Sequence, residues 1–114
     1  EAFGKPVLDF QNTRFELAHC KSQVMATRTF VDYCIQREIA GELDAVTASM
    51  AKMQATDMLD DVVDRCLQLF GGYGYLWEYG IEKIVRDLRV HRILEGTNEI
   101  MRLIVSRAAL EGAA

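Results

Sequence analysis

The sequence has very little proline, no cysteine pair at metal-ligand spacing, and no long apolar run. A single proline, Pro6, leaves the rest of the chain free to form long helices. Cys20, Cys34 and Cys66 are too widely spaced for a metal motif, so we expect no metal and read them as buried small hydrophobic residues. Three unpaired cysteines fit a reducing, cytoplasmic location. No apolar run approaches the roughly 20 residues of a membrane helix, so we expect no membrane span.

Positive charge is also scarce. The 114 residues carry 13 Lys and Arg against 17 Asp and Glu, a formal net charge of -4. This balance argues against nucleic acid or an anionic membrane surface as a partner. We find no signal-peptide pattern, low-complexity tract or internal repeat. Half of the residues are hydrophobic, which is enough for a core, so we expect one domain over 1–114 or a piece of a larger protein.

Hydrophobic periodicity predicts an all-α fold. After an initial turn over residues 1–6, we expect a long helix over 7–40, because apolar residues recur every seven positions. The residues of this stripe are Phe10, Leu17, Val24 and Val31, with Cys20, Thr27 and Cys34 at the positions between them. At about 1.5 Å per residue this helix would be roughly 50 Å long, the length of a bundle strut. Gly41 is expected to end it.

A second long helix is predicted from an Asp44 N-cap to about Phe70. Its four central aspartates are expected to face solvent; they are Asp57, Asp60, Asp61 and Asp64. Gly71 and Gly72 should stop it, and a glycine-rich aromatic loop should cover 71–80. Two shorter helices are predicted over 81–90 and from Thr97 or Asn98 to residue 110, with 111–114 fraying.

These elements suggest an up-and-down helical bundle with two long antiparallel helices and two short ones. Periodicity alone leaves a second fold open, an isolated four-helix bundle of unrelated topology.

The stretch 92–102 departs from the helical pattern. Glu95 follows two large apolar residues, Ile93 and Leu94, and precedes Gly96, which permits a tight backbone path. A helix then begins, and helix N-termini attract anions through free N–H groups and the helix dipole. The pattern predicts a turn that presents one carboxylate beside an apolar wall. Residue types alone do not name a reaction, and a solvated loop carboxylate is the alternative interpretation.

Two motifs in the chain resemble those of the acyl-CoA dehydrogenase family. Leu-Glu-Gly-Thr-Asn-Glu-Ile at 94–100 is similar to the family's C-terminal signature, and Gln-Leu-Phe-Gly-Gly-Tyr-Gly-Tyr at 68–75 to an upstream motif. Arg86-Asp87 between these motifs, and Phe-Gly-Lys-Pro at 3–6 with Gln11 at the start of the chain, also occur in the family's order. The resemblance covers nearly the whole chain. It implies the C-terminal helical domain, without the N-terminal domain, the middle β domain and the first helix of the C-terminal domain.

The resemblance implies α,β-dehydrogenation of acyl-CoA thioesters with FAD, as in the β-oxidation of fatty acids. Glu95 matches the catalytic base that removes the α proton while the flavin takes a hydride from the β carbon. A carboxylate becomes a stronger base when water is removed, which Ile93 and Leu94 would assist. The thioester oxygen also needs hydrogen-bond donors. The resemblance implies that these donors are the backbone N–H of the base and a ribityl hydroxyl of the flavin. Gly96 matches a backbone position near the thioester.

The resemblance also implies a flavin site. The matching positions are Gln11, Gln68, Gly71, Gly72, Thr97 and Glu99. The run 68–72 resembles a contact to FAD bound mainly by a neighbouring subunit, which implies a homo-oligomer, dimer or tetramer, with an intersubunit cofactor site. Electrons would pass to an electron-transfer flavoprotein. From residue types alone, the two glycines indicate only a helix end and Thr97 only a cap.

The family's full enzymes are several times longer than this chain. The flavin-contacting Arg of the Arg-x-x-Phe-Gly motif would stand immediately before Glu1, so we expect a fragment that carries the base but is inactive alone. We also expect its long apolar face to pair with a second copy. A second function, of another class, is a non-catalytic helical oligomerisation module. The intact motifs around Glu95 and over 68–72 favour the enzyme, although they do not specify acyl chain length.

Overall fold

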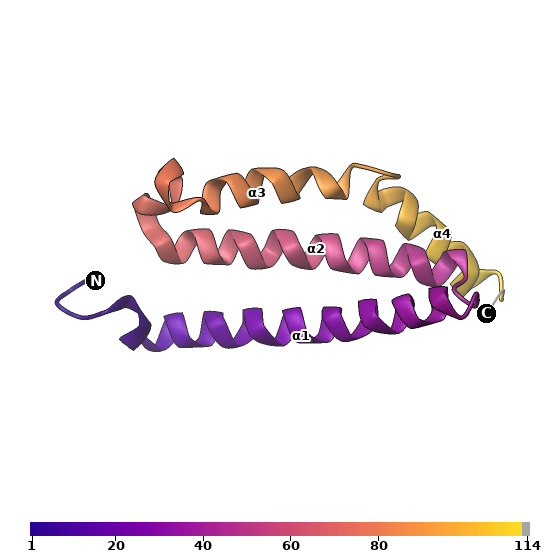
Figure 1. Ribbon diagram of the computed structural model, residues 1–114, viewed down its shortest axis with the longest axis horizontal. Helices are drawn as coiled ribbons and strands as arrows, with labels where there is room; N and C mark the ends of the chain where they lie inside the picture. Colours follow the sequence, from indigo (N-terminus) through magenta and orange to yellow (C-terminus); the bar gives the residue numbers. More distant parts are fainter. Residues whose placement is uncertain (113–114) are drawn as a thin grey trace.

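The computed structural model describes residues 1–112, and within them the fold is helical (Figure 1). The expectation that 111–114 fray lies partly outside the described residues. The prediction of two long and two short helices is confirmed. The α-helices are α1 (Gln11–Ile39), α2 (Ala45–Phe70), α3 (Ile81–Arg89) and α4 (Asn98–Leu110). Short 3₁₀ turns lie before α1, between α2 and α3, and between α3 and α4: η1 (Val7–Asp9), η2 (Gly71–Tyr75), η3 (Trp77–Tyr79) and η4 (Val90–Arg92).

Helix α2 is the central element. It packs against α1, α3 and α4, and the molecule extends 57 Å along its longest dimension. Figure 1 shows α1 and α3 on opposite sides of α2, with α4 crossing its N-terminal half. The N-terminus lies at the end of the molecule where α2 finishes, far from α4. Because α2 contacts every other helix, its side chains can hold segments that are distant in the sequence.

The first long helix begins later than predicted. We expected it from residue 7, but Phe10 is extended with ψ 135°, and α1 starts at Gln11. The preceding residues form only the 3₁₀ turn η1, closed by the Phe10 N–H, which donates to the Val7 carbonyl at 3.1 Å. The expected initial turn is present, because Ala2 and Lys5 exchange backbone hydrogen bonds of 2.9 and 3.2 Å. The backbone therefore bends at Phe10, and the helix is shorter by about one turn.

Small side chains line the contact between α1 and α2. Those of α1 that are buried recur every seven residues and are Thr13, Cys20, Thr27 and Cys34. The burial expected for the cysteines is confirmed for these two. Desolvation by burial, with Cys66 beside it, raises the pKa of the Cys20 thiol. The larger residues of the predicted stripe are less covered, since Leu17 is 37% and Val24 41% exposed. The helices therefore meet along the small residues, and the large ones flank the seam.

The predicted end of α1 and the predicted start of α2 are confirmed. Gly41 has φ 72° and follows α1, where its N–H donates to Glu38 and that of Glu42 donates to Arg37, at 3.0 and 2.8 Å. This pair of bonds is a Schellman motif, which needs a left-handed residue. At the start of α2, the Asp44 carboxylate accepts the Thr47 N–H at 2.8 Å. The turn between α1 and α2 is thus fixed by local sequence.

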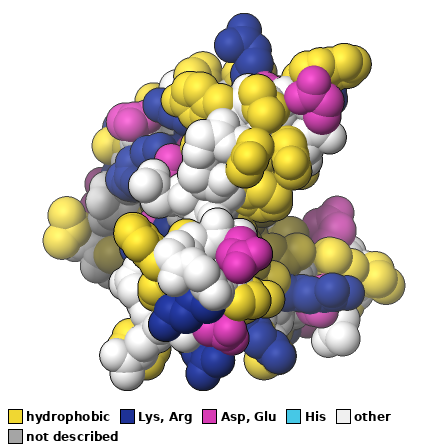
Figure 2. All heavy atoms as spheres, turned by 90° about the vertical axis from the view of Figure 1, so that its left-hand side faces the viewer, with side chains coloured by type: hydrophobic (Ala, Val, Ile, Leu, Met, Phe, Trp, Pro, Cys, Tyr) yellow, Lys and Arg dark blue, Asp and Glu magenta, His cyan; other side chains and the backbone are white. Residues whose placement is uncertain are grey.

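Large hydrophobic side chains remain exposed on several parts of the molecule, and two groups of them are extensive. One follows the outer face of α1 and includes Phe15, Met25 and Tyr33. The other gathers at the end formed by η2 and η3, visible among the yellow side chains in Figure 2, and comprises Tyr73, Tyr75, Leu76, Trp77 and Tyr79. Among the described residues no helix is both long and apolar enough to span a membrane. Surfaces of this kind are usual at interfaces with other protein.

Candidate active site

The predicted turn at Glu95 is present and its backbone is strained. Glu95 has φ 56° and Gly96 φ 90°, so two consecutive residues are left-handed immediately before α4. The left-handed region costs a non-glycine residue roughly 1–2 kcal/mol. An added Cβ at Gly96 would lie 2.7 Å from Met101 Cε, so the end of the Met101 side chain would have to shift. Strain of this kind collects at functional sites.

Thr97, rather than Asn98, caps the last helix. Its side-chain oxygen accepts the Ile100 N–H at 3.3 Å, and α4 starts at the next residue. Asn98 does not cap the helix. Its side chain is only 1% exposed, and it is the largest fully buried side chain of residues 1–112. The sequence allowed either residue as the N-cap. The Thr97 hydrogen bond and the burial of Asn98 assign the cap to Thr97.

Asn98 joins the turn to α2 through a polar network. Its Oδ1 accepts from Lys52 Nζ at 2.7 Å, and its Nδ2 donates to Thr56 Oγ1 and Asp57 Oδ1 at 2.9 and 2.8 Å. Lys52 Nζ also donates to the Gly96 carbonyl at 2.8 Å. Buried polar groups with all their partners specify one geometry. The turn that carries Glu95 is therefore attached to the most central helix.

Asp57 holds both ends of the same segment. Its Oδ1 lies 3.1 Å from Arg92 Nε and its Oδ2 2.9 Å from Arg102 Nη2, so one carboxylate binds a residue before the turn and one after it. Arg92 also reaches Asp60 at 3.3 Å. Charge-assisted bonds are stronger than neutral ones, most of all where the groups lose contact with water. Residues 92–102 are thus tied to α2 at three points.

The prediction that the aspartates of α2 form a solvated face is wrong for two of them. The side chains of Asp57 and Asp60 are 34% and 14% exposed and are covered by arginines from the other chain segments. Asp61 is exposed and pairs with Arg65 and His19, linking α2 to α1. Acidic spacing on a helix does not reveal whether arginines from elsewhere will cover it.

The site residues predicted from the sequence lie in two separate groups. Glu95, Gly96, Thr97 and Glu99 come together at the start of α4. Gln68, Gly71 and Gly72 lie at the far end of α2, and Gln11 is the first residue of α1 at that same end (Figure 1). Gly71 is 19 residues beyond Lys52 on α2, which is about 28 Å at 1.5 Å per residue. One chain therefore does not bring the two groups into one compact site.

Sequence reasoning missed Lys52, Asn98 and Asp57 as supports of the turn. One signal was available for Lys52, because it is the only charged residue between Asp44 and Asp57. A lone charge in a mostly apolar helical stretch indicates a specific partner. Nothing in the sequence identified that partner, since it lies 44 residues further along the chain.

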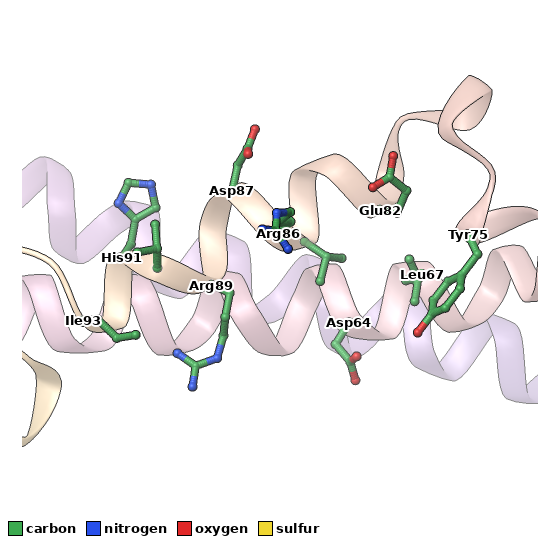
Figure 3. A pocket seen from close by; sticks show the side chains of 11 residues that line it. Asp64, Leu67, Tyr75, Glu82, Arg86, Asp87, Arg89, His91 and Ile93 are labelled. Atoms are coloured by element: carbon green, nitrogen blue, oxygen red, sulfur yellow. The ribbon is translucent and has the colours of Figure 1, made fainter.

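The apolar wall beside Glu95 is open in this chain. Ile93 and Leu94 are 56% and 44% exposed, and the Glu95 side chain is exposed. A groove of about 1030 Å³ lies elsewhere, between α2 and α3, and its lining includes Asp64, Glu82, Arg89 and Ile93 but not Glu95 (Figure 3). The dryness expected around the carboxylate is thus not provided by residues 1–112 alone.

Comparison with known proteins agrees with this fold. The family description "Acyl-CoA dehydrogenase, C-terminal domain" matches residues 1–110. The long-chain specific acyl-CoA dehydrogenase of rat mitochondria is 45% identical over 94% of this chain. The crystal structure of an acyl-CoA dehydrogenase from Geobacillus kaustophilus superimposes with a TM-score of 0.93 at 42% identity, over 96% of this chain and 29% of its own. A structure described as the electron transferring flavoprotein of Acidaminococcus fermentans superimposes with a TM-score of 0.92 at 35% identity, over 96% of this chain and 29% of its own.

These matches also favour the expected topology over an unrelated four-helix bundle. The chain spans only 25% of the length of the rat relative. The match extends over both motifs, at 68–75 and 94–100, and over the order of the helices. The chain therefore belongs to the acyl-CoA dehydrogenase family, of which it forms the C-terminal helical domain.

Proposed function

We propose that this chain supplies the catalytic carboxylate of an FAD-dependent acyl-CoA dehydrogenase, and that this carboxylate is Glu95. The observation that carries the proposal is the left-handed backbone of Glu95, φ 56°, on a turn tied to α2 at three points. A turn that had only to begin a helix would have no need of a strained glutamate. The geometry presents the carboxylate outward, with Ile93 and Leu94 beside it.

The chemistry follows from the needs of the reaction. The α proton of a thioester is weakly acidic, so Glu95 has to accept it from a substrate held close by, with water excluded. The exposed Ile93 and Leu94 would form one side of that dry site when another segment covers them. The Glu95 N–H would donate to the thioester oxygen and stabilise the charge that develops there. FAD, when bound, would accept the hydride from the β carbon.

The residues present fit a flavin. At the start of α4 the Thr97 hydroxyl and the exposed Glu99 carboxylate can bond the hydroxyl groups of a ribityl chain or sugar. At the end of α2, Gly71 and Gly72 are exposed, and a Cβ at either would meet no atom within 4 Å. Such bare backbone allows a pyrophosphate to approach closely. Gln68 and Gln11 are exposed at the same end and offer amide donors.

We propose further that the two groups serve different copies of the cofactor. Their separation of about 28 Å along α2 supports an intersubunit site, in which one chain supplies the start of α4 and a second supplies 68–72. The exposed aromatic side chains of η2 and η3 beside that motif support an interface there. The proposal includes a homodimer or tetramer that forms before FAD binds.

The substrate would be an acyl-CoA and the electron acceptor an electron-transfer flavoprotein. The names of the relatives support these assignments at the level of class only. We propose that the chain acts within a longer polypeptide, because its relatives are about four times its length and its apolar faces are uncovered. A cytoplasmic location is part of the proposal, and fractionation of the host cell would test it.

The test uses the full polypeptide that carries this chain. The purified protein is mixed with a panel of acyl-CoAs, and bleaching of the flavin absorbance is followed with and without Glu95→Gln. The amide keeps the size of the side chain but accepts no proton, so the rate should fall by at least about 1,000-fold. Glu111→Gln, near the end of the chain and exposed, is the matched control and should bleach normally.

The outcomes separate three interpretations. Bleaching in the parent and its loss in Glu95→Gln supports the proposal. A normal rate in the variant means that another segment supplies the base. Absence of both flavin and bleaching in the parent would favour the second function, a non-catalytic oligomerisation module, for which the exposed outer face of α1 is the specific observation. The mass of the natural gene product gives an independent check, because a module of this length needs no longer parent.

A further inference from the structure

We propose that Lys52 is a positioning residue for Glu95, an inference that rests on the proposed function of Glu95 as the base. The Lys52 ammonium donates to the Gly96 carbonyl at 2.8 Å and to Asn98 Oδ1 at 2.7 Å. These acceptors belong to the first and third residues after the carboxylate. Lys52, a residue of α2, therefore bonds two residues of the turn and attaches the turn to α2.

The partners of Lys52 distinguish it from an ordinary surface lysine. Among residues 1–112 it forms no ion pair, and both of its hydrogen bonds go to neutral oxygens of one turn. Asn98 is 1% exposed, and its Nδ2 is already committed to Thr56 and Asp57. Since the amide group cannot turn without breaking those bonds, its oxygen is a fixed acceptor for Lys52. The Lys52 ammonium is thus held by the fixed Asn98 side chain, and it holds the more flexible Gly96 backbone in turn.

The flexible partner is the Gly96 peptide. A glycine at φ 90° has many other conformations open to it, and the preceding Glu95 is itself in a region that its side chain disfavours. Two hydrogen bonds from a charged donor oppose relaxation of this turn. If Lys52 is lost, we expect Glu95 to leave the left-handed region and its carboxylate to move away from the α carbon of the substrate.

The experiment compares four variants of the full flavoprotein by the rate of flavin reduction with an acyl-CoA. Lys52→Met keeps the length of the side chain but donates no hydrogen bond. Lys52→Arg keeps the charge and the donors. Lys83→Met is the matched control, because Lys83 is 75% exposed and, within residues 1–112, pairs only with Asp87 on α3. Glu95→Gln reports on the proposed function separately.

A displacement of about 1 Å costs about 100-fold in rate. We therefore expect Lys52→Met to lose about 100-fold in kcat with KM and flavin content near those of the parent. Lys52→Arg should recover at least a tenth of the parental rate, and Lys83→Met should match the parent. Hydrogen exchange should rise in peptides covering 93–99 for Lys52→Met only, which a general loss of stability would not produce.

Two results would overturn the assignment of Lys52. One is a Lys52→Met rate within threefold of the parent while Glu95→Gln is inactive. The other is a loss in Lys52→Met that Lys52→Arg does not restore and that is accompanied by exchange throughout α2 and α4, which means a general structural role. A normal rate in Glu95→Gln instead overturns the proposed function itself, and with it this inference. If Lys52→Met does not fold, Lys52→Gln, whose side chain is shorter and uncharged, replaces it and is judged by the same rate and exchange criteria.

Discussion

Asn98 Nδ2 donates to Asp57 Oδ1 at 2.8 Å, so the first residue of α4 is held on the middle of α2. The same carboxylate binds Arg92 and Arg102 on either side of the turn. These contacts give residues 92–102 a defined position on α2. The stability of the turn and the geometry of Glu95 should therefore respond to changes on a helix that carries no candidate catalytic group.

The first prediction concerns Asn98 itself. Asn98→Ala removes three hydrogen bonds and leaves Lys52, Thr56 and Asp57 without one partner each. Unsatisfied buried groups cost about 1–3 kcal/mol, so we expect a loss of about 2–3 kcal/mol in the free energy of unfolding. Urea denaturation followed by circular dichroism measures it. Asn12→Ala, on the exposed face of α1, is the control and should change stability by less than about 0.5 kcal/mol. Equal effects of the two variants would mean that the network adds nothing.

The second prediction separates stability from activity at Glu95. Glycine has no Cβ to clash in the left-handed region, so Glu95→Gly should relieve the strain at φ 56°. We expect it to raise the free energy of unfolding by about 1 kcal/mol while abolishing flavin bleaching. Thermal denaturation provides the first value and the acyl-CoA assay the second. Glu95→Ala retains a Cβ and should be inactive without the gain. A Glu95→Gly variant less stable than Glu95→Ala would contradict the argument from strain.

Local sequence was sufficient for much of this fold. The ends of the long helices follow from Gly41 and Asp44, each of which satisfies backbone groups within a few residues. The left-handed turn at Glu95 could be located because a glycine and two cap-forming residues follow it. The start of α1 was misplaced by four residues, since the stripe continues through Phe10 although the backbone there is extended.

Contacts between distant segments were not predictable in the same way. Nothing near Asp57 in the sequence indicates that Arg92 and Arg102 will cover it, because both belong to elements placed by the packing of α3 and α4. The candidate flavin residues likewise came from resemblance to a family. The structure adds that they lie in two groups, one beside the middle of α2 and one at its C-terminal end. Such separation depends on topology, which a linear motif does not contain.

The third prediction is a dependence on pH at the start of α2. The Thr47 N–H donates to the Asp44 carboxylate and lowers its pKa in the folded protein. A lowered pKa means that this contribution to stability is present above the unfolded value of about 3.9 and is lost as pH falls through the folded value. Asp44→Ala should therefore lower the urea midpoint at pH 7 and have less effect at pH 3. Asp32→Ala, an exposed position within α1, separates loss of a cap from loss of a charge. An Asp44→Ala effect that is equal at both pH values would exclude the ionised cap.

The fourth prediction concerns Gly74, the only buried residue of η2. A Cβ there would lie 2.9 Å from the Leu67 carbonyl oxygen and 3.1 Å from Phe70 Cβ, so the turn would have to move away from the end of α2. We expect Gly74→Ala to lower the free energy of unfolding by about 1–3 kcal/mol. Gly72→Ala, two residues earlier, is the matched control, because a Cβ there meets nothing within 4 Å. Both are compared by urea denaturation without flavin, since Gly72 is a proposed cofactor contact. If the two variants are equally stable, the close packing of η2 on α2 does not contribute to the fold.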